Sequence, residues 1–482
     1  MNLDEYARFD AVELARLVRT REVSARELQR LAVAGAEAVN PELNAVIEIF
    51  ADRRGGIEAA DLPDGPFRGV PFFVKDLGCA EAGRTRESGS RLMQGYVADQ
   101  DTEVMRRFRA SGLVSLGRTT TPEFGATGTT ESILTGATRN PWNTGHSSGG
   151  SSGGSAAIVA AGVVPMASGG DGGGSIRIPA SACGLVGLKP SRGRVTRAPS
   201  GSNLISPLVQ ELGMTRTVRD TAGLLDVIHG PAPGDAFEIR PPARPYAEEV
   251  GAPVGRLRIA MSTGPWGPYA SDPAVIVAVE TTARLLEDMG HVVEVARPDI
   301  SYEAYFQSFA DLWCAAKPAA LDAAAALTGR RVDETTVEPN VLAMYLKGQT
   351  YSATDLIRIY ESINVISRQV AAFHETYDLL MTPTMARPPV PLGYADLNHP
   401  ELDVAGVMDR LFSLFTYTPL INMTGQPAIS LPLHWSADGL PIGVHFVARF
   451  GAEDLLLRHA AALEQAAPWR ERRPPVHVAT ND

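Results

Sequence analysis

The spacing of apolar residues predicts that the chain begins with helices. Asp10 is placed to cap a helix in "AVELARLVRT", and Ser24 to Glu27 form a capping box that opens a second amphipathic helix, expected to end near Val39. The next apolar run, "NAVIEIF", has the composition of a strand. Residues 1–65 are therefore expected to form an N-terminal helical segment.

Beyond that segment, strand and helix patterns alternate. Strands are predicted in "GVPFFVK" and "LVSLGRT", with a helix near "DTEVMRRFRASG", and a strand–helix–strand unit begins at "GRLRIAMST". An alanine-rich helical stretch near 302–370 precedes the strand "YDLLMTPT", a hairpin around "ADG" and a closing helix. This alternation predicts an α/β fold with a central mixed, largely parallel twisted sheet that is covered by helices on both faces.

No internal repeat and no long low-complexity linker divides the chain. Its 482 residues, 44% of them hydrophobic, can bury one large core or several smaller ones. Without a candidate boundary, the simplest expectation is a single domain over residues 1–482.

Charge and composition exclude several classes of protein. The net charge of −11 argues against nucleic-acid binding, which needs a basic surface. No apolar stretch approaches the roughly 20 residues that span a bilayer, and the start "MNLDEYARFD" lacks the plan of a signal peptide. Cys79, Cys183 and Cys314 have no CxxC spacing. We therefore expect a soluble cytoplasmic protein with reduced thiols, no metal, no cofactor and no membrane or nucleic-acid partner.

Lysine is rare in this chain, which has only four among its 44 basic residues: Lys75, Lys189, Lys317 and Lys347. Arginine keeps its proton in proteins, whereas a buried lysine can lose it and act as a base. Lys75 ends the apolar run "GVPFFVK" and is the candidate for such a base. Taken by itself, this segment favours the plainer interpretation of a strand-end lysine that reaches water.

Serines and glycines concentrate between Ser147 and Lys189, where three kinds of site can be compared. The segment has no P-loop, and the dinucleotide fingerprint fails because its sixth position is Ser175. "GGSSG" matches a hydrolase nucleophile elbow, with Asp378 and His445 in the required order. However, the turn formers before it argue against the strand that an elbow must follow.

The third kind of site is a serine nucleophile with a lysine base. A neutral buried lysine can take the proton from a serine hydroxyl, and consecutive backbone N–H groups in "DGGGS" can bind a developing oxyanion. Glycines suit such a loop because they permit unusual dihedral angles and leave room for a substrate. A tight glycine-rich turn without catalytic function explains this segment about equally well.

Several motifs together resemble the amidase signature family, whose members hydrolyse amides with a Ser-Ser-Lys triad. They are Lys75 in "GVPFFVKD", Ser151 in "GGSSGGS", Ser175 in "DGGGSIRIPA" and the following "CGLVGLKPSRGRV". The resemblance extends through "ATRNPWN", "DLLMTPT", "GQPAISLPL" and "DGLPIGVHFVA", almost to "ERRPPV". Within the family, "RNPWN" and the C-terminal segment look most like bacterial 6-aminohexanoate cyclic dimer hydrolases and related amidases.

The resemblance implies a role for each matching residue. Ser175 would be the nucleophile, and Ser151, after a cis peptide bond from Gly150, would pass its proton to neutral Lys75. The implied oxyanion donors and supporting residues are Gly172, Gly173, Gly174 and Ser175 for the oxyanion, Ser152 for the triad, and an Asp171–Arg177 ion pair bracing the loop. Many relatives carry Thr, Gln or Ile at the position of Gly172, so we expect a looser loop here.

The substrate is expected between the core and a helical region. Residues 66–230 would form the catalytic core, and residues 300–370 a variable helical region on the substrate side. The stretches predicted to line the pocket are "GATGTTESILTG" from Gly125, "APSGSNLIS" from Ala198, the helix from Phe306 to Trp313 and Cys314, and "LFSLFTYT" from Leu411. The pocket residues singled out are Gly125, Ala126, Thr127, Gly128, Trp313 and Cys314.

The apolar character of these stretches favours a small uncharged substrate, such as an amide of an aryl or medium-chain acid or a linear or cyclic oligoamide. Carbamate or ester hydrolysis on the same triad is an alternative. So are a glutaminase-type subunit of a tRNA-dependent amidotransferase and a non-catalytic binding protein, although the latter would be expected to lack a triad residue. Homodimers are common in the family, so a homodimer is compatible with the resemblance.

Overall fold

The computed structural model describes residues 1–479 apart from residues 200, 205, 237, 265 and 400. Ser200 and Ile205 belong to the stretch from Ala198 that was predicted to line the substrate pocket, and they lie outside the described residues.

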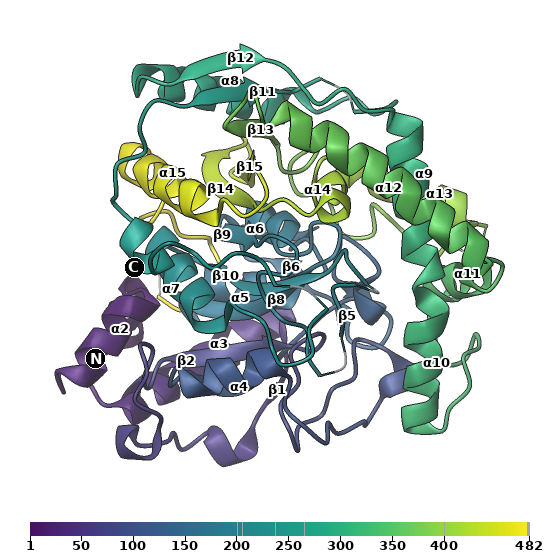
Figure 1. Cartoon of the computed structure of the whole chain (residues 1–482). Coiled ribbons are helices and arrows are strands. Elements are labelled where there is room, and N and C mark those ends of the chain that lie inside the picture. The colour runs from purple at the N-terminus through teal and green to yellow at the C-terminus, as the bar shows by residue number, and fades with distance from the viewer. Residues whose placement is uncertain (200, 205, 237, 265, 400, 480–482) are drawn as a thin grey trace.

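Helices and strands alternate along most of the chain (Figure 1). The helices are α1 (Leu3–Arg8), α2 (Ala11–Arg19), α3 (Ala25–Leu43), α4 (Glu103–Ala110), α5 (Gly153–Ala160), α6 (Arg177–Cys183), α7 (Val218–Ile228), α8 (Pro273–Asp288), α9 (Tyr302–Ala315), α10 (Lys317–Thr328), α11 (Pro339–Gly348), α12 (Ala353–Phe373), α13 (Val404–Phe415), α14 (Thr418–Thr424) and α15 (Glu453–Ala466). The strands are β1 (Val46–Ile49), β2 (Pro71–Lys75), β3 (Val114–Thr119), β4 (Glu131–Ser132), β5 (Gly136–Ala137), β6 (Arg139–Asn140), β7 (Asn143–Ser147), β8 (Met166–Asp171), β9 (Val186–Lys189), β10 (Gln210–Thr215), β11 (Arg258–Met261), β12 (Val292–Val295), β13 (Leu379–Pro383), β14 (Ala428–Trp435) and β15 (Pro441–Ala448).

Eleven of these strands form one mixed sheet in the order β1-β3-β2-β8-β10-β9-β14-β15-β13-β11-β12. The parallel pairs are β2 with β3 and β8, and β11 with β12 and β13. The other neighbours, including the central run from β8 to β15, are antiparallel. A single continuous sheet flanked by helices confirms the predicted α/β class and the single large domain.

The two predicted N-terminal helices begin as expected at α2 and α3, but α1 was not predicted. Only the Ser24 half of the predicted capping box forms, because the Glu27 carboxylate pairs with the Met1 amino group instead. The Asp10 side chain accepts a hydrogen bond from the Glu13 N–H, and Ser24 accepts one from the Glu27 N–H. Helix α3 continues to Leu43, past the predicted end near Val39, with a proline in its last turn. The helix ends at Asn44, whose N–H still donates to the Asn40 carbonyl oxygen. The Asn44 backbone adopts a left-handed conformation, which turns the chain away from the helix axis.

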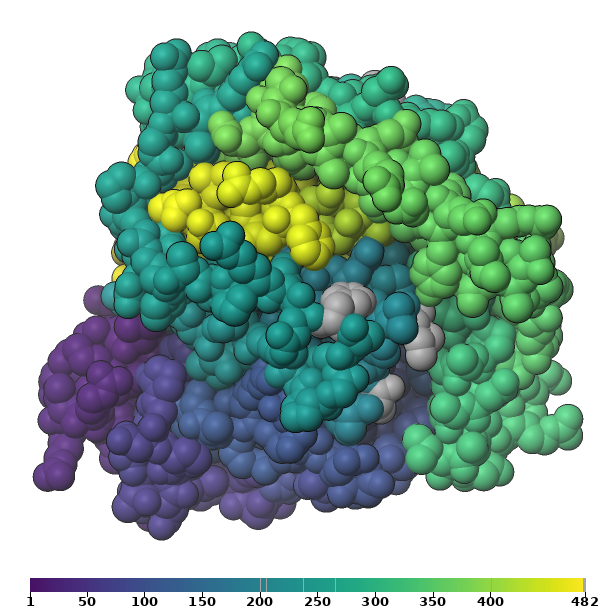
Figure 2. All heavy atoms as spheres, viewed as in Figure 1, coloured from purple at the N-terminus to yellow at the C-terminus, as the bar shows by residue number. Residues whose placement is uncertain are grey.

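The end of the chain returns to its beginning. Arg473 pairs with Asp4 at 2.9 Å, so the C-terminal segment is tied to the first helix. Figure 2 shows the yellow C-terminal segment embedded between teal residues from the middle of the chain and the green helical segment. Among the described residues, no helix combines the length and the apolar character needed to cross a membrane.

Candidate active site

Two residues of the site, Lys75 and Asp171, lie at the ends of neighbouring strands. Lys75 is the last residue of β2 and Asp171 the last of β8, and the two strands run parallel with Phe73 opposite Ala167. Their carboxyl ends therefore meet at the same edge of the sheet, where α/β proteins commonly place their ligands. The Lys75 N–H also donates to Ser168 Oγ at 2.8 Å, which fixes the end of β2 against β8.

Lys75 turns into the protein and meets Ser151. Its Nζ donates to Ser151 Oγ at 2.7 Å, and both residues are only 2% exposed. Burial lowers the pKa of Lys75 from 10.5 to about 8, although the charges of Glu211 and Asp171 act in the opposite direction. The interpretation of Lys75 as a strand-end lysine that reaches water is therefore wrong, because the strand carries it into the core rather than to the surface.

Ser151 lies in a tightly packed turn before α5. The expected cis peptide bond joins Gly150 to Ser151. A Cβ atom on Gly150 would lie 2.6 Å from the carbonyl oxygen of Thr129, so a side chain has no room there. The turn formers before this serine do not exclude strand structure, because β6 and β7 pair as a small two-stranded sheet of their own. This sheet is separate from the central one.

Ser152 connects the two serine segments through its backbone. Its N–H donates to the carbonyl oxygen of Ser175 at 3.3 Å, while its hydroxyl donates to the Gly170 carbonyl oxygen at 3.4 Å. Within the described residues, no hydrogen bond joins the Ser152 hydroxyl to a triad side chain. The hydrogen bond that Ser152 makes to a triad residue is thus one between backbone groups, which holds the two serine segments together.

The carboxylate of Asp171 organises the loop that carries Ser175. Oδ1 accepts hydrogen bonds from the Gly174 N–H at 2.7 Å and from Arg177 Nη2 at 2.9 Å. Oδ2 accepts from Arg177 Nε at 2.9 Å and from the Ile176 N–H at 3.2 Å. The predicted ion pair is present, and it fastens the backbone on both sides of Ser175.

Arg177 is completely buried and has partners far away in the sequence. Its Nη2 donates to Asn422 Oδ1 at 2.6 Å, and its Nη1 lies 3.0 Å from His445 Nε2. Burial raises the pKa of Asp171, but the charge and hydrogen bonds of Arg177 and a hydrogen bond from Asn422 outweigh burial and hold that pKa well below its usual range. Asp171 therefore stays charged beside the Arg177 guanidinium.

The candidate oxyanion hole is smaller than predicted. The Gly174 N–H already donates to Asp171, so it is not free for a substrate oxygen. Among the described residues, no acceptor bonds the N–H groups of Gly172, Gly173 or Ser175. Gly174 is required for another reason: its φ is +130°, and a Cβ atom there would lie 2.3 Å from Thr418 Oγ1.

An aromatic pair from α9 packs on the glycine loop. Phe309 and Trp313 stack with ring centroids 5.5 Å apart. A Cβ atom on Gly172 would lie 3.1 Å from Trp313, and one on Gly173 would lie 3.1 Å from Phe309. The missing side chain at Gly172 thus lets an aromatic ring approach the backbone, which argues against the looser loop that was expected.

Ser175 opens into an apolar cavity. The cavity is lined by Gly125, Ala126, Thr127, Gly128, Gly173, Ser175, Ile178, Phe309, Trp313, Leu411, Phe412, Phe415 and Pro419. The four predicted residues from Gly125 to Gly128 and Trp313 are thus brought together beside Ser175. Cys314 is not part of this lining, although it is buried in the apolar cluster to which Ala126, Ile178 and Phe415 also belong.

Two positions have functions that sequence patterns did not reveal. Asn422 and His445 both contact Arg177, from 245 and 268 residues away. His445 had been considered as the base of an elbow-type triad. That interpretation is wrong, because His445 lies against Arg177 and Asp378 caps the Arg258 N–H. One feature of the sequence could have pointed to Asn422 and His445: each is a polar residue inside an otherwise apolar segment.

Comparisons with known proteins agree with this geometry. Residues 27–457 match the family model described as Amidase. The chain is 40% identical over 477 residues to the 6-aminohexanoate-cyclic-dimer hydrolase of Paenarthrobacter ureafaciens, covering 96% of each chain. It is 32% identical over 478 residues to the acylamidase of Rhodococcus erythropolis, again with 96% of each chain covered.

A solved structure of a 6-aminohexanoate cyclic dimer hydrolase superposes with a TM-score of 0.91 at 39% identity, covering 98% of this chain and 99% of that chain. Sequence, family model and structure therefore agree, and the chain belongs to the amidase family.

Proposed function

We propose that this amidase-family hydrolase cleaves amides of uncharged acids through an acyl-enzyme on Ser175, with Ser151 and Lys75 as its proton relay. The observation that carries the proposal is the 2.7 Å contact between Lys75 Nζ and Ser151 Oγ, at a lysine whose pKa burial lowers to about 8. A lysine with such a pKa is neutral often enough near neutral pH to accept a proton.

The proposed reaction has two stages. In the first, Ser175 Oγ attacks the amide carbonyl carbon and its proton passes through Ser151 to Lys75, while the oxyanion is held by backbone N–H groups of the glycine loop. The C–N bond then breaks, and Lys75 returns the proton through Ser151 to the leaving amine. In the second stage, water attacks the ester carbon by the same relay and frees both the acid and Ser175.

The lining of the cavity supports an uncharged acyl group. None of its described residues carries a charge, and most of the ring and aliphatic side chains come from α6, α9, α13 and α14. Two relatives are named as a cyclic-dimer hydrolase and an acylamidase. We therefore assign amides of aryl or medium-chain acids, including linear and cyclic oligoamides, as the substrate class.

The test is to trap the acyl-enzyme in single serine variants. Wild type is expected to release p-nitroaniline from acyl p-nitroanilides and to take up one fluorophosphonate, located on Ser175 by peptide mass spectrometry. Ser175→Ala should lose both signals. Ser151→Ala should lose turnover and label slowly, because the nucleophile remains but its relay is broken.

A matched control uses a serine on the substrate-side helices. Ser367 on α12 donates its hydroxyl to the Ile363 carbonyl oxygen at 2.7 Å, so Ser367→Ala should retain turnover and labelling. Label found on Ser151 rather than Ser175 would overturn the assignment of the nucleophile. Release of ammonia from glutamine without any release of p-nitroaniline would instead assign the site to glutaminase chemistry.

A further inference from the structure

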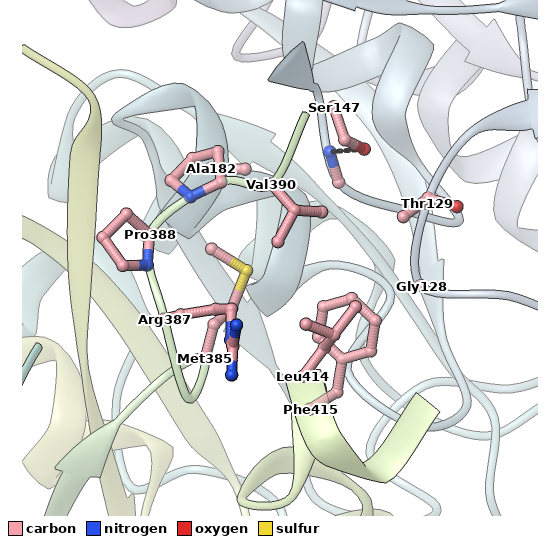
Figure 3. Close-up of a pocket in the computed structure, with 12 residues that line it drawn as sticks. Gly128, Thr129, Ser147, Ala182, Met385, Arg387, Pro388, Val390, Leu414 and Phe415 are labelled. Carbon is pink, nitrogen blue, oxygen red and sulfur yellow. Dashed lines mark hydrogen bonds between the residues drawn. The ribbon is translucent and has the colours of Figure 1, made fainter. Parts of the chain in front are cut away.

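The pocket behind Gly128 and Phe415 is too small to hold part of a substrate (Figure 3). Its lining includes Met385, Leu414 and the charged Arg387. Its volume is about 10 Å³, no more than one water molecule needs. A side chain on the opposite face of the central sheet bears more directly on the reaction.

Glu211 lies on β10, beside the end of β8. The two strands are antiparallel, and Glu211 stands opposite Gly170, the residue before Asp171. Lys75 ends β2, the parallel neighbour of β8 on its other side. Side chains alternate between the two faces of a sheet, so Lys75 and Asp171 lie on one face and Glu211 lies on the other. The thickness of the sheet therefore separates the Glu211 carboxylate from Lys75.

Two glycines leave the space that this carboxylate fills. A Cβ atom on Gly170 would lie 2.8 Å from Glu211 Oε2. One on Gly78, three residues after Lys75, would lie 2.7 Å from Glu211 Oε1. Gly78 is needed for its φ of +89° in any case, whereas Gly170 has no such backbone requirement. The Glu211 carboxylate thus lies against the backbone of the segments that carry Lys75 and Asp171.

This carboxylate is buried without a direct partner, and Glu211 is only 9% exposed. Among the described residues, none donates a hydrogen bond to it or forms an ion pair with it within 4 Å, although buried carboxylates normally have such partners. Burial raises the pKa of Glu211, and the more distant charges of Arg197, Lys75 and Arg86 oppose this rise. Lys75 is therefore one of three cations that favour the charged form of Glu211.

The effect on Lys75 is reciprocal. Burial lowers the pKa of Lys75, and the charge of Glu211 opposes this more strongly than that of Asp171. Asp171 is paired with Arg177, which offsets its charge, whereas Glu211 has no cation in contact. The other titratable groups packed around these side chains are Asp76, which is paired with Arg118, and Cys79, whose thiol pKa is raised by burial. Glu211 is thus the main electrostatic influence that keeps a proton on Lys75.

We propose that Glu211 is a positioning residue for Lys75: its carboxylate, on the opposite face of the sheet, sets by its charge how much of Lys75 is free to accept a proton. The inference deepens the proposed function and rests on it, because the charge of Lys75 affects turnover only if Lys75 is the base. With Glu211 ionised, Lys75 holds its proton to higher pH and is a stronger base once it has lost it. Glu211 thus moves the acid side of the pH profile upward.

The direct test measures the titration of Lys75 by NMR. The chain has only four lysines, so protein labelled with ¹³C at lysine Cε gives few signals, and Lys75→Arg identifies the one from Lys75. Glu211→Gln removes a charge across the sheet and should lower the Lys75 midpoint by about 0.5–1 pH unit. Glu211→Leu should lower it at least as much. Glu211→Asp keeps the charge and should leave the midpoint within about 0.3 units of wild type.

The same shift should appear in turnover. For an acyl p-nitroanilide, the pH at which kcat/KM reaches half its plateau should fall by about 0.5–1 unit in Glu211→Gln. Relative to its own plateau, kcat/KM at about pH 6.5 should then rise about three- to tenfold. A purely structural role of Glu211 would lower the melting temperature and the plateau without moving this midpoint.

Glu464→Gln is the matched control. Glu464 on α15 is another carboxyl group whose pKa burial raises, to about 7. Within the described part of the chain, the charges that act on Lys75 are those of Glu211 and Asp171. The same substitution at Glu464 should therefore leave the NMR midpoint and the pH profile within about 0.2 units of wild type.

The two measurements separate this inference from the proposed function. An NMR midpoint that moves by less than about 0.3 units, or upward, in Glu211→Gln and Glu211→Leu would overturn the inference, as would equal shifts for Gln and Asp. A lowered NMR midpoint with an unchanged pH profile would instead contradict Lys75 as the base, and with it the proposed function. An unchanged NMR midpoint together with lost turnover in Lys75→Arg would contradict the influence of Glu211 alone.

Discussion

The surroundings of Lys75 and those of Asp171 bury ionisable groups in opposite ways. Lys75 is inside the core, where its ammonium group makes one hydrogen bond among the described residues, to Ser151, and burial lowers its pKa to about 8. Asp171 is at least as deeply buried, yet Arg177 and Asn422 keep its pKa well below the usual range. One group is thus brought close to losing its charge, while the other is held charged.

This difference matches the two tasks that we propose for Lys75 and Asp171. A proton relay needs a group that changes its protonation state near the working pH, and burial with few partners provides one. A brace needs a group that never changes, and a fully hydrogen-bonded ion pair provides that. Comparable burial is compatible with either task, so the partners of a buried group say more about its function than its burial does.

The largest expected effect comes from removing the titrating group. Lys75→Arg keeps a positive charge but cannot accept a proton, so kcat/KM for an acyl p-nitroanilide should fall by about 10²–10⁴-fold. The fold should persist, since a site whose lysine titrates near pH 8 already holds a cation at neutral pH. Circular dichroism and the melting temperature check the fold.

The control for this substitution is the exposed Lys347, which lies over the ring of Tyr351. Lys347→Arg makes the same chemical change far from the serines and should leave kcat/KM within about twofold of wild type. Activity of Lys75→Arg close to that of Lys347→Arg would sink the assignment of Lys75 as the base.

The second largest effect is expected when Arg177 loses its charged partner, Asp171. Asp171→Asn leaves Arg177 as a buried cation without its carboxylate, which typically costs about 3–5 kcal/mol. The free energy of unfolding in urea should fall by this amount, and the loop of Ser175 should lose its fastening at Gly174. A fall of less than about 1 kcal/mol would show that the pair does not brace the loop.

The three catalytic candidates could be found from the sequence because their motifs are local. Taken alone, the glycine-rich segment of Ser175 fits a structural turn about equally well, and the segment of Lys75 favours a lysine that reaches water; only together do these motifs resemble those of the amidase signature family. Asn422 and His445 could not be found in this way. They reach Arg177 only after the sheet has brought segments more than 200 residues apart into contact.

The same limit applies to the fold. The alternation of apolar patterns predicts the strand–helix–strand unit from β11 to β12, because that unit is contiguous in sequence. It does not predict that β9 pairs with β14, since periodicity carries no information about which distant strands become neighbours. Cys314 was misplaced for a related reason: adjacent residues on a helix point in different directions, and only the packed structure shows which of them faces the cavity.

A moderate effect is expected at the far side of the brace. His445 Nε2 lies 3.0 Å from Arg177 Nη1. Because a guanidinium group can only donate, Nε2 is the hydrogen-bond acceptor and the imidazole ring is neutral. Burial, with the charge of Arg177, lowers the pKa of His445 well below its usual value. His445→Leu removes an acceptor from a charged donor, which costs about 1.5–3 kcal/mol of stability in urea denaturation.

His445→Gln is the matched variant, because its amide oxygen can accept from Arg177 and should restore most of the loss. Equal destabilisation by leucine and glutamine would mean that packing, rather than the hydrogen bond, explains the effect of His445.

The pH profile tests the comparison further, because kcat/KM is expected to change about tenfold per pH unit below the pKa of Lys75. If neutral Lys75 is the base, log kcat/KM should rise with slope 1 up to about pH 8 and then level off. Asp171 should add no step, since its pKa lies well below this range. The unfolded chain, with a lysine pKa near 10.5, binds more protons between about pH 8 and 10.5, so the Lys75 contribution to stability should increase with pH there.

The smallest expected effect concerns Ser152, which lies between the surroundings of Lys75 and those of Asp171. Ser152 joins the Ser151 turn to the Ser175 loop through its N–H, and this bond survives any side-chain replacement other than proline. Its hydroxyl makes a long 3.4 Å contact with Gly170, so Ser152→Ala should lower kcat/KM by only about twofold. A loss of a hundredfold or more in kcat at unchanged melting temperature would instead show that the hydroxyl joins the relay during turnover, and Lys75 would then have a second partner. With two hydrogen-bond partners, Lys75 would then resemble Asp171, which is held by several partners, more closely than the structure without substrate indicates.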